Sequence, residues 1–416
     1  MYNWRMRSSH FTDIACTVCG SVCDDLQIEV RDGRITQARN ACSLAEPWFL
    51  KQREASPAIA HVQELSVAFD EACVQAAAWL RTAKYPLIYG LSRSTTEGQR
   101  AATALADRIG ATIDTTASTG HAASIIALQQ VGESTCTLGE VKQRADLVIF
   151  WGSDPIRTHP RHIERYCPPR AGRTIVVVDV ERTATAEQAD LFIPIPAHSD
   201  WDALWQLRML VRGVAEATPG DDALRDLAQR MKAARFGIVF FGAGLTTGPV
   251  AHRSVEALLQ LVTDLNMYTR FYARRMRRFG DVAGADSVLT WQTGYPFGVN
   301  FAAGYPRYNP GEFTGPEMLA RGEPDLCVIV GSDTIRGFTD AAREYLNRIP
   351  VILLDSPEAE PFDHANCIRF TTAIYGIHKP GTAYRLDEVP IPLKVLLPTE
   401  LPSDADVLFD LLNRLK

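Results

Sequence analysis

Two stretches of this sequence nearly repeat each other: ADLVIFWGSDPIR at residues 145–157 and PDLCVIVGSDTIR at residues 324–336. Each opens with a continuous apolar run and then reads Gly-Ser-Asp. A short strand that is apolar at every position is typical of a parallel sheet covered by helices on both faces. The repeat therefore predicts two related α/β units.

The sequence around each copy repeats the same order of elements. Residues 84–111 and 235–266 each read as a strand, a loop and an amphipathic helix. Residues 174–183 and 350–359 each read as a further strand that ends near an aspartate, Asp179 in the first copy and Asp355 in the second. This alternation predicts an α/β fold with two duplicated Rossmann-like parallel-sheet units behind a small N-terminal domain.

We expect four parts along the chain. They are an iron–sulfur-type N-terminal domain at 1–60, a first α/β unit at 61–210, a second α/β unit at 211–360, and a C-terminal segment at 361–416 that packs on the α/β core.

Both Gly-Ser-Asp motifs follow a predicted strand, and ligands of doubly wound sheets bind beyond the carboxyl ends of strands. Glycine lets a phosphate or a pterin approach the backbone, and Ser or Asp caps the following helix. The alternative is ordinary turn chemistry after a strand, which a single copy would favour. The candidate ligand-binding residues are Gly152, Ser153, Asp154, Gly331, Ser332 and Asp333.

Four cysteines crowd the N-terminal part, at Cys16, Cys19, Cys23 and Cys42. Four thiolates suit a [4Fe–4S] cluster or a tetrahedral zinc ion. Zinc sites usually pair two C-x2-C motifs, and only one is present here, so the spacing favours a cluster. Four buried cysteines without a ligand remain the third alternative. The stretch between the last two, LQIEVRDGRITQARN, predicts a β-hairpin that turns at Asp32-Gly33.

Composition narrows the class of protein. The 416 residues are 46% hydrophobic and 22% charged, with a formal net charge of −6, which is ordinary for a globular protein. No basic run resembles a nucleic-acid footprint, and no apolar stretch approaches the ~18 residues of a membrane span, so we expect neither nucleic acid nor membrane as a partner. The N-terminus lacks the apolar core of a signal peptide, and nine cysteines fit a reducing compartment. We therefore expect a cytoplasmic protein.

The combination of a four-cysteine N-terminal part with two related α/β units resembles the molybdenum/tungsten bis-pterin oxidoreductases. In those enzymes a cluster domain precedes two α/β domains that each hold one pterin dinucleotide. Within that superfamily the chain is similar, nearly end to end, to the B subunit of formylmethanofuran dehydrogenase. The resemblance is carried by CTVCGSVCDD, by TLGEVKQRADLVIFWGSDP with THPRH, by WQTGYPFGVNFAAGYPRYNPGE, and by GTAYRLDEVPIPLK.

One position departs from that family. The family carries a cysteine or selenocysteine that binds tungsten or molybdenum in a TAS-x-C-H segment, whereas this sequence reads TASTGH at 116–121. Gly120 stands in place of the metal-binding sulfur and offers no side-chain ligand. His121 matches the family's active-site histidine, and Arg277 matches an arginine beside the metal. Without the metal we expect both to be leftover polar groups. The other cysteines (Cys73, Cys136, Cys167, Cys327 and Cys367) read as core or helix residues.

The resemblance places the chain closest to the B subunit of the bacterial formyltransferase/hydrolase complex of tetrahydromethanopterin-linked one-carbon metabolism in methylotrophs. There the amidohydrolase-like A subunit hydrolyses the formyl group of a carrier to formate, and the D subunit transfers formyl to the carrier. We expect a non-catalytic subunit without a tungsten- or molybdenum-pterin, which scaffolds the A, C and D subunits. The alternatives are an active tungsten or molybdenum enzyme that reduces CO2 to formate, and an iron–sulfur electron-transfer module.

Overall fold

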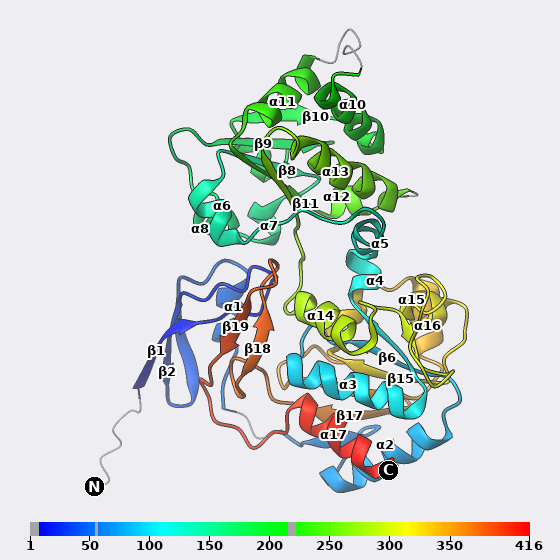
Figure 1. The fold of residues 1–416 in the computed structure, drawn as a ribbon. Coiled ribbons are helices and arrows are strands. Elements are labelled where there is room, and N and C mark those ends of the chain that lie inside the picture. Colours follow the sequence, from blue (N-terminus) through cyan, green and yellow to red (C-terminus); the bar gives the residue numbers. More distant parts are fainter. Residues whose placement is uncertain (1–7, 55–56, 215–221, 249) are drawn as a thin grey trace. The chain divides into compact units, whose positions relative to one another are not determined.

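The computed structural model describes residues 8–54, 57–214, 222–248 and 250–416. The chain divides into two compact units (Figure 1). Unit 1 combines residues 1–119 with 279–416, and unit 2 consists of residues 120–278.

The N-terminal part of unit 1 is a three-stranded antiparallel sheet. It consists of β1 (Ser8–Ile14), β2 (Leu26–Arg31) and β3 (Arg34–Arg39), followed by α1 (Ala45–Leu50). The predicted hairpin is confirmed, because β2 and β3 pair on either side of Asp32 and Gly33. Both turn residues have positive φ, +47° and +73°, as a two-residue type I′ turn requires. Phe49 and Ile28 lie in the apolar core under this sheet.

Unit 1 is built around a nine-stranded mixed sheet with the order β14-β13-β7-β6-β15-β16-β17-β4-β5. Its strands are β4 (Ala60–Val62), β5 (Leu65–Val67), β6 (Pro86–Gly90), β7 (Thr112–Thr115), β13 (Val299–Asn300), β14 (Arg307–Tyr308), β15 (Leu326–Val330), β16 (Val351–Asp355) and β17 (Cys367–Thr371). The remaining elements are α2 (Phe69–Thr82), α3 (Thr96–Ile109), α4 (Ala117–Gly120), which ends in unit 2, α14 (Val282–Thr293), α15 (Gly315–Ala320), the 3-10 helix η1 (Ser332–Gly337), α16 (Asp340–Leu346), β18 (Gly381–Tyr384), β19 (Pro390–Leu393) and α17 (Asp404–Arg414). The C-terminal segment contributes β17 to the sheet, and α17 packs against α2 and α3.

Unit 2 contains a five-stranded parallel sheet with the order β10-β9-β8-β11-β12. Its strands are β8 (Leu147–Trp151), β9 (Thr174–Asp179), β10 (Leu191–Pro194), β11 (Phe236–Phe241) and β12 (Arg270–Arg275). The helices are α5 (Ala122–Val131), α6 (Leu138–Arg144), α7 (Pro155–Thr158), α8 (His162–Tyr166), α9 (Ala184–Glu187), α10 (Asp200–Arg212), α11 (Asp222–Ala233), α12 (Ala243–Thr246) and α13 (Ala251–Leu265). Helices α10 and α13 pack against each other and bury Leu204, Leu207 and Leu258.

The duplication read from the sequence is present in both sheets. The central parallel strands of unit 1 follow the order β7-β6-β15-β16-β17, and those of unit 2 follow β12-β11-β8-β9-β10. The repeated stretches form β15 and β8, which therefore occupy equivalent places. Both are buried along their whole length, as their apolar sequences predict. The two units differ in chain order, because β6 and β7 precede β15 whereas β11 and β12 follow β8.

This difference corrects the expected boundaries at 61–210 and 211–360. Strand β6 of the first expected unit pairs in parallel with β15 of the second, with Ile88 opposite Val328. Likewise β8 pairs with β11, with Ile149 opposite Val239. Hydrogen bonds between strands far apart in sequence define the units, so unit 2 is one continuous insertion between the two segments of unit 1.

Among the described residues, no helix has the length and apolar content to span a membrane.

Candidate functional site

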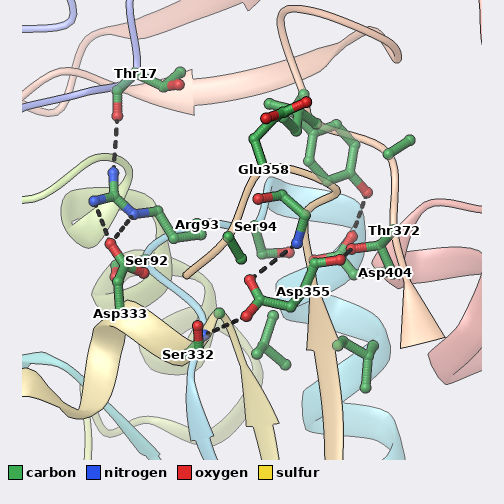
Figure 2. Close-up of a pocket in the computed structure, with 18 of the residues that line it drawn as sticks. Thr17, Ser92, Arg93, Ser94, Ser332, Asp333, Asp355, Glu358, Thr372 and Asp404 are labelled. Atoms are coloured by element: carbon green, nitrogen blue, oxygen red, sulfur yellow. Dashed lines mark hydrogen bonds and ion pairs between the residues drawn. The ribbon is translucent and has the colours of Figure 1, made fainter. Parts of the chain in front are cut away.

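Unit 1 contains a cavity of about 420 Å³ at the carboxyl ends of β6, β15 and β16 (Figure 2). This is the edge at which doubly wound sheets bind ligands. The polar residues of its wall are Thr17, Lys51, Ser92, Arg93, Ser94, Asp281, Ser332, Asp333, Arg336, Asp355, Ser356, Glu358, Glu360, Thr372, Tyr375 and Asp404. Of the predicted ligand-binding residues, Gly331, Ser332 and Asp333 lie in this wall, and the other candidates do not.

The turn after β15 forms one side of the cavity. Gly331 has φ +85°, and its N–H donates to the carbonyl of Leu354 at 2.9 Å. A Cβ on Gly331 would lie 3.2 Å from Cγ of the Arg93 side chain, so a residue other than glycine would both be strained and push against the cavity wall.

Asp355 ends β16 and lies beside this turn. The N–H groups of Ser332 and Ser356 donate to its two carboxyl oxygens at 3.3 and 2.9 Å. Burial nevertheless raises the pKa of Asp355 above its ordinary value. A carboxylate is an acceptor only, so this residue suits a ligand that presents hydroxyl or N–H donors. An aspartate at this place in Rossmann folds binds ribose hydroxyls.

A second carboxyl group lies on another side of the cavity. Asp404, the first residue of α17, accepts a hydrogen bond from the Tyr375 hydroxyl at 2.6 Å and from the N–H of Ala405 at 2.7 Å. Burial raises the pKa of Asp404 and of Tyr375.

Sequence reasoning missed Ser92, Arg93 and Ser94, although they follow the strand predicted at the start of residues 84–111, which is β6, and could have been placed at this edge. The sequence gave no signal for Asp404, because that residue comes from a helix at the other end of the chain.

Cations also line the wall of the cavity: Arg93 pairs with Asp333, and Arg336 pairs with Glu360 at 2.9 Å. The cavity therefore combines carboxyl acceptors for hydroxyl or N–H groups with two guanidinium groups, each paired with a carboxylate, that an anion could bind only in competition with those pairs. This mixture is compatible with the nucleotide portion of a cofactor.

The equivalent turn of unit 2 is occupied by protein contacts. Gly152 has φ +53°, and a Cβ there would lie 2.8 Å from the backbone nitrogen of Leu245 and 3.0 Å from Cα of Gly244. The Asp154 carboxylate accepts from the N–H and hydroxyl of Thr185 at 3.1 and 2.5 Å. Close packing against α12, the short helix after β11, thus accounts for this glycine, as the ordinary-turn alternative requires.

Gly120 lies at the end of α4 and is exposed. A Cβ built on it would have no atom within 4 Å, so the backbone leaves room for a side chain that this sequence lacks. His121 follows as the N-terminal flanking residue of α5 and is buried. Its carbonyl accepts a hydrogen bond from the Ser124 hydroxyl at 2.8 Å.

Arg277 lies beyond β12 and is buried, and its backbone carbonyl accepts a hydrogen bond from Nε2 of His159 at 2.7 Å. Burial lowers the pKa of His159 to about 4. His162 is also fully buried, with its ring 4.6 Å from that of Phe240, and burial lowers its pKa well below the ordinary value. These two histidines of the THPRH motif belong to the core of unit 2.

The four N-terminal cysteines share one neighbourhood. The Cys16 N–H donates to the carbonyl of Cys23 at 2.8 Å, and Val22 donates to the carbonyl of Cys19 at 3.2 Å. Burial raises the pKa of Cys16 and Cys19, the latter to about 12, and the neighbouring thiols, Cys42 included, add to both shifts. Sulfur donors suit a cluster or zinc. Within the described ranges, however, no three His, Cys, Asp or Glu side chains converge as a metal site requires, so a metal here stays a prediction.

The nine cysteines all lie in the described ranges and none of them forms a disulfide, and the five outside this neighbourhood are buried. Cys327 lies in β15, Cys367 in β17 and Cys73 in α2. Burial raises the pKa of Cys367 to about 11. A buried thiol of raised pKa is a poor nucleophile and a poor metal ligand, since the thiolate performs both functions.

No family model matches the chain. It is, however, 38% identical to the B subunit of tungsten-containing formylmethanofuran dehydrogenase 2 from Methanocaldococcus jannaschii, over 97% of this chain and 98% of that protein. The chain belongs to the family of formylmethanofuran dehydrogenase B subunits. The same protein of Methanococcus maripaludis is 36% identical over 97% of this chain and 98% of its own length.

The B subunit of the formyltransferase/hydrolase complex Fhc from Methylorubrum extorquens is 27% identical over 63% of this chain and 72% of that protein. The two tungsten-containing relatives are thus more similar to this chain than the Fhc protein is, although the sequence led us to expect the opposite ranking.

Two solved structures share the fold of this family member. The FhcABCD complex from Methylorubrum extorquens with methylofuran matches with a TM-score of 0.72 at 22% identity, covering 86% of this chain and 98% of that one. Acetylene hydratase from Pelobacter acetylenicus matches with a TM-score of 0.63 at 12% identity, covering 96% of this chain and 69% of that one.

Proposed function

We propose that this chain is the non-catalytic B subunit of a formyltransferase/hydrolase complex in cytoplasmic, tetrahydromethanopterin-linked one-carbon metabolism. In this role it holds the formyl-hydrolysing subunit and its neighbours in place, and formate leaves without oxidation or reduction. The observation that carries the proposal is Gly120, which by the resemblance stands where the family carries a sulfur ligand.

Tungsten or molybdenum held by pterin dithiolenes would supply the acceptor for the hydride of formate. A glycine cannot complete such a coordination sphere from the protein side. The five other cysteines support the same conclusion, because all five are buried and none of them lies in the segment around Gly120. We therefore assign no redox step to His121 or Arg277.

A complex partner is supported by the relatives. The Fhc B subunit and the FhcABCD structure are named for multi-subunit assemblies. We propose A-, C- and D-type subunits as the neighbours of this chain.

A second function is favoured by different observations. Identities of 38% and 36% over nearly the whole chain are to tungsten-containing dehydrogenases, and the cavity of unit 1 would suit the nucleotide portion of a pterin cofactor. An active dehydrogenase would then need a metal ligand other than residue 120. The cysteines Cys16, Cys19, Cys23 and Cys42 support a third function, that of an iron–sulfur electron-transfer module.

Metal and cofactor analysis of the anaerobically purified complex separates the three. The scaffold predicts no tungsten, no molybdenum and no pyranopterin dinucleotide in acid extracts, together with formate release from a formylated carrier. Stoichiometric pterin with tungsten or molybdenum would establish the dehydrogenase and overturn the scaffold. Stoichiometric iron without pterin would support the electron-transfer module.

A further inference from the structure

One side chain in the cavity wall reaches the loop that carries three of the cysteines. We call residues 15–25, between β1 and β2, the cysteine loop. Arg93 directs Nε and Nη2 at Oδ2 of Asp333, at 2.9 and 2.5 Å, and its Nη1 lies 3.4 Å from the carbonyl oxygen of Thr17 (Figure 2). A single guanidinium thus joins the Gly331–Asp333 turn to the cysteine loop.

The backbone around this contact is closely packed. A Cβ on Gly280 would lie 2.5 Å from the carbonyl oxygen of Ser92 and 3.1 Å from that of Thr17. The cysteine loop is closed by the bond from the Cys16 N–H to the carbonyl of Cys23. Because Thr17 adjoins Cys16, a shift of Thr17 acts directly on that closing bond.

The two contacts of Arg93 differ in strength. The carboxylate of Asp333 takes both donors of one edge of the guanidinium in a charge-assisted pair, whereas the bond to Thr17 is neutral at its acceptor and long. The side chains of Arg93 and Asp333 are 33% and 30% exposed and both line the cavity. An anion that enters the cavity therefore competes most easily for Nη1.

We propose that Arg93 couples the cavity to the cysteine loop: a phosphate-bearing ligand in the cavity takes Nη1 of Arg93 from Thr17 and loosens residues 15–25. Coupling between two sites is reciprocal, so an ordered cysteine loop also weakens anion binding. This rests on the cavity being a ligand site, which the second candidate function above requires and the scaffold function does not. Its test uses a different readout from the metal and pterin analysis, so the two fail independently.

The experiment is hydrogen exchange with mass spectrometry on the purified complex, titrated with inorganic pyrophosphate. Peptides covering residues 15–25 should exchange several-fold faster in a saturable manner, while peptides of the unit 2 sheet should not change. Arg93→Gln should exchange fast in this loop without pyrophosphate and should lose the response.

Two further variants keep the test decisive. Arg336→Gln is the matched control, because Arg336 lines the same cavity but pairs with Glu360, and it should keep the response. Asp333→Asn removes the competing carboxylate and should give the response at lower pyrophosphate concentrations. An unchanged cysteine loop in the wild type at saturating salt-matched pyrophosphate, or an equal response in Arg93→Gln, overturns the proposal.

Discussion

At the scale of single residues, the two copies of the Gly-Ser-Asp motif, at 152–154 and 331–333, have different surroundings in the fold. Gly152 permits the close approach of α12, whereas Gly331 forms part of a cavity wall. The sequence predicted both as turns after buried strands but could not separate them, because the deciding neighbours come from other parts of the chain: Gly244 lies in α12, and Arg93 lies in the loop after β6. The hypothesis about Gly120 came from the sequence alone, since it concerns a missing side chain, and it stays a prediction.

Replacing Gly120 by cysteine should be tolerated without restoring a dehydrogenase. With no atom within 4 Å of the new Cβ, the free energy of unfolding should change by no more than about 0.5 kcal/mol. Thermal unfolding and dye-linked formate oxidation of the complex measure both outcomes, and we expect no oxidation because the cofactor must also be inserted.

Gly315→Cys is the matched control for this variant. A Cβ at Gly315 would lie 2.9 Å from Cδ2 of Tyr89, so overpacking should cost about 1–3 kcal/mol. Formate oxidation by the unmodified complex would contradict the non-catalytic assignment, and gain of oxidation by Gly120→Cys would contradict the need for cofactor insertion.

The buried histidines of unit 2 predict a loss of stability in mild acid. Burial depresses the pKa of His162, and that of His159 to about 4, while both would titrate near ~6.5 when unfolded. Below that pH the unfolded state binds more protons, so stability falls as pH decreases, by up to about 1.4 kcal/mol per pH unit for each histidine.

His162→Phe removes one of these groups, in a pocket already lined by Phe150 and Phe240. Urea unfolding between neutral pH and mildly acidic pH should show a smaller slope for this variant than for the wild type. His252→Gln, at a partly exposed position on α13, is the control and should keep the wild-type slope. Equal slopes for all three proteins would refute the assignment.

At the scale of elements, the local sequence pattern was sufficient to predict an element wherever the residues that pair in it are close in sequence. The β2–β3 hairpin was predictable because Asp32-Gly33 fixes the turn type and the pairing next to the turn, whereas the register shift between Glu29 and Val30 was not predicted. The strands of both sheets were predictable because burial on two faces requires continuous apolar runs. The placement of Cys16 and Cys42 in one neighbourhood was not predictable in geometric detail, since it depends on how α1 packs under the sheet.

The cysteine loop should stabilise the N-terminal sheet. Cys19→Ser replaces a thiol that is 7% exposed by a hydroxyl, which favours opening of residues 8–54 whether or not a metal is bound. Limited proteolysis should cut this part faster and assembly of the complex should weaken, while formyl hydrolysis per assembled complex stays near the wild-type value. Cys73→Ala, in the core under α2, should leave proteolysis of residues 8–54 unchanged. A variant that assembles normally but loses hydrolysis would indicate a redox role.

At the scale of the whole molecule, the duplication could be predicted from the sequence, but the order in which the chain forms the strands of each sheet could not. Sequence similarity identifies equivalent strands, and it carries no information about which copy of a strand pairs with which. Strand β11 precedes β15 more closely in sequence than β6 does. Strand β15 nevertheless pairs with β6, from which all of unit 2 separates it in sequence. Pairings of such sequence separation cost loop-closure entropy, which the buried sheet of unit 1 must offset.

The order of the strands along the chain leads to a final prediction, which concerns the fragments of the chain that can fold alone. Residues 120–278 contain the complete β10-β9-β8-β11-β12 sheet and the core around Leu204 and Val239. This fragment should therefore fold alone and unfold cooperatively in urea. The fragment 61–210, which matches the boundaries expected from sequence, is the control. It separates β6 from β15 and β8 from β11, which leaves apolar strand edges unpaired, so it should aggregate or lack a cooperative transition. Cooperative unfolding of 61–210, or its absence in 120–278, would show that sheet pairing does not define the folding units.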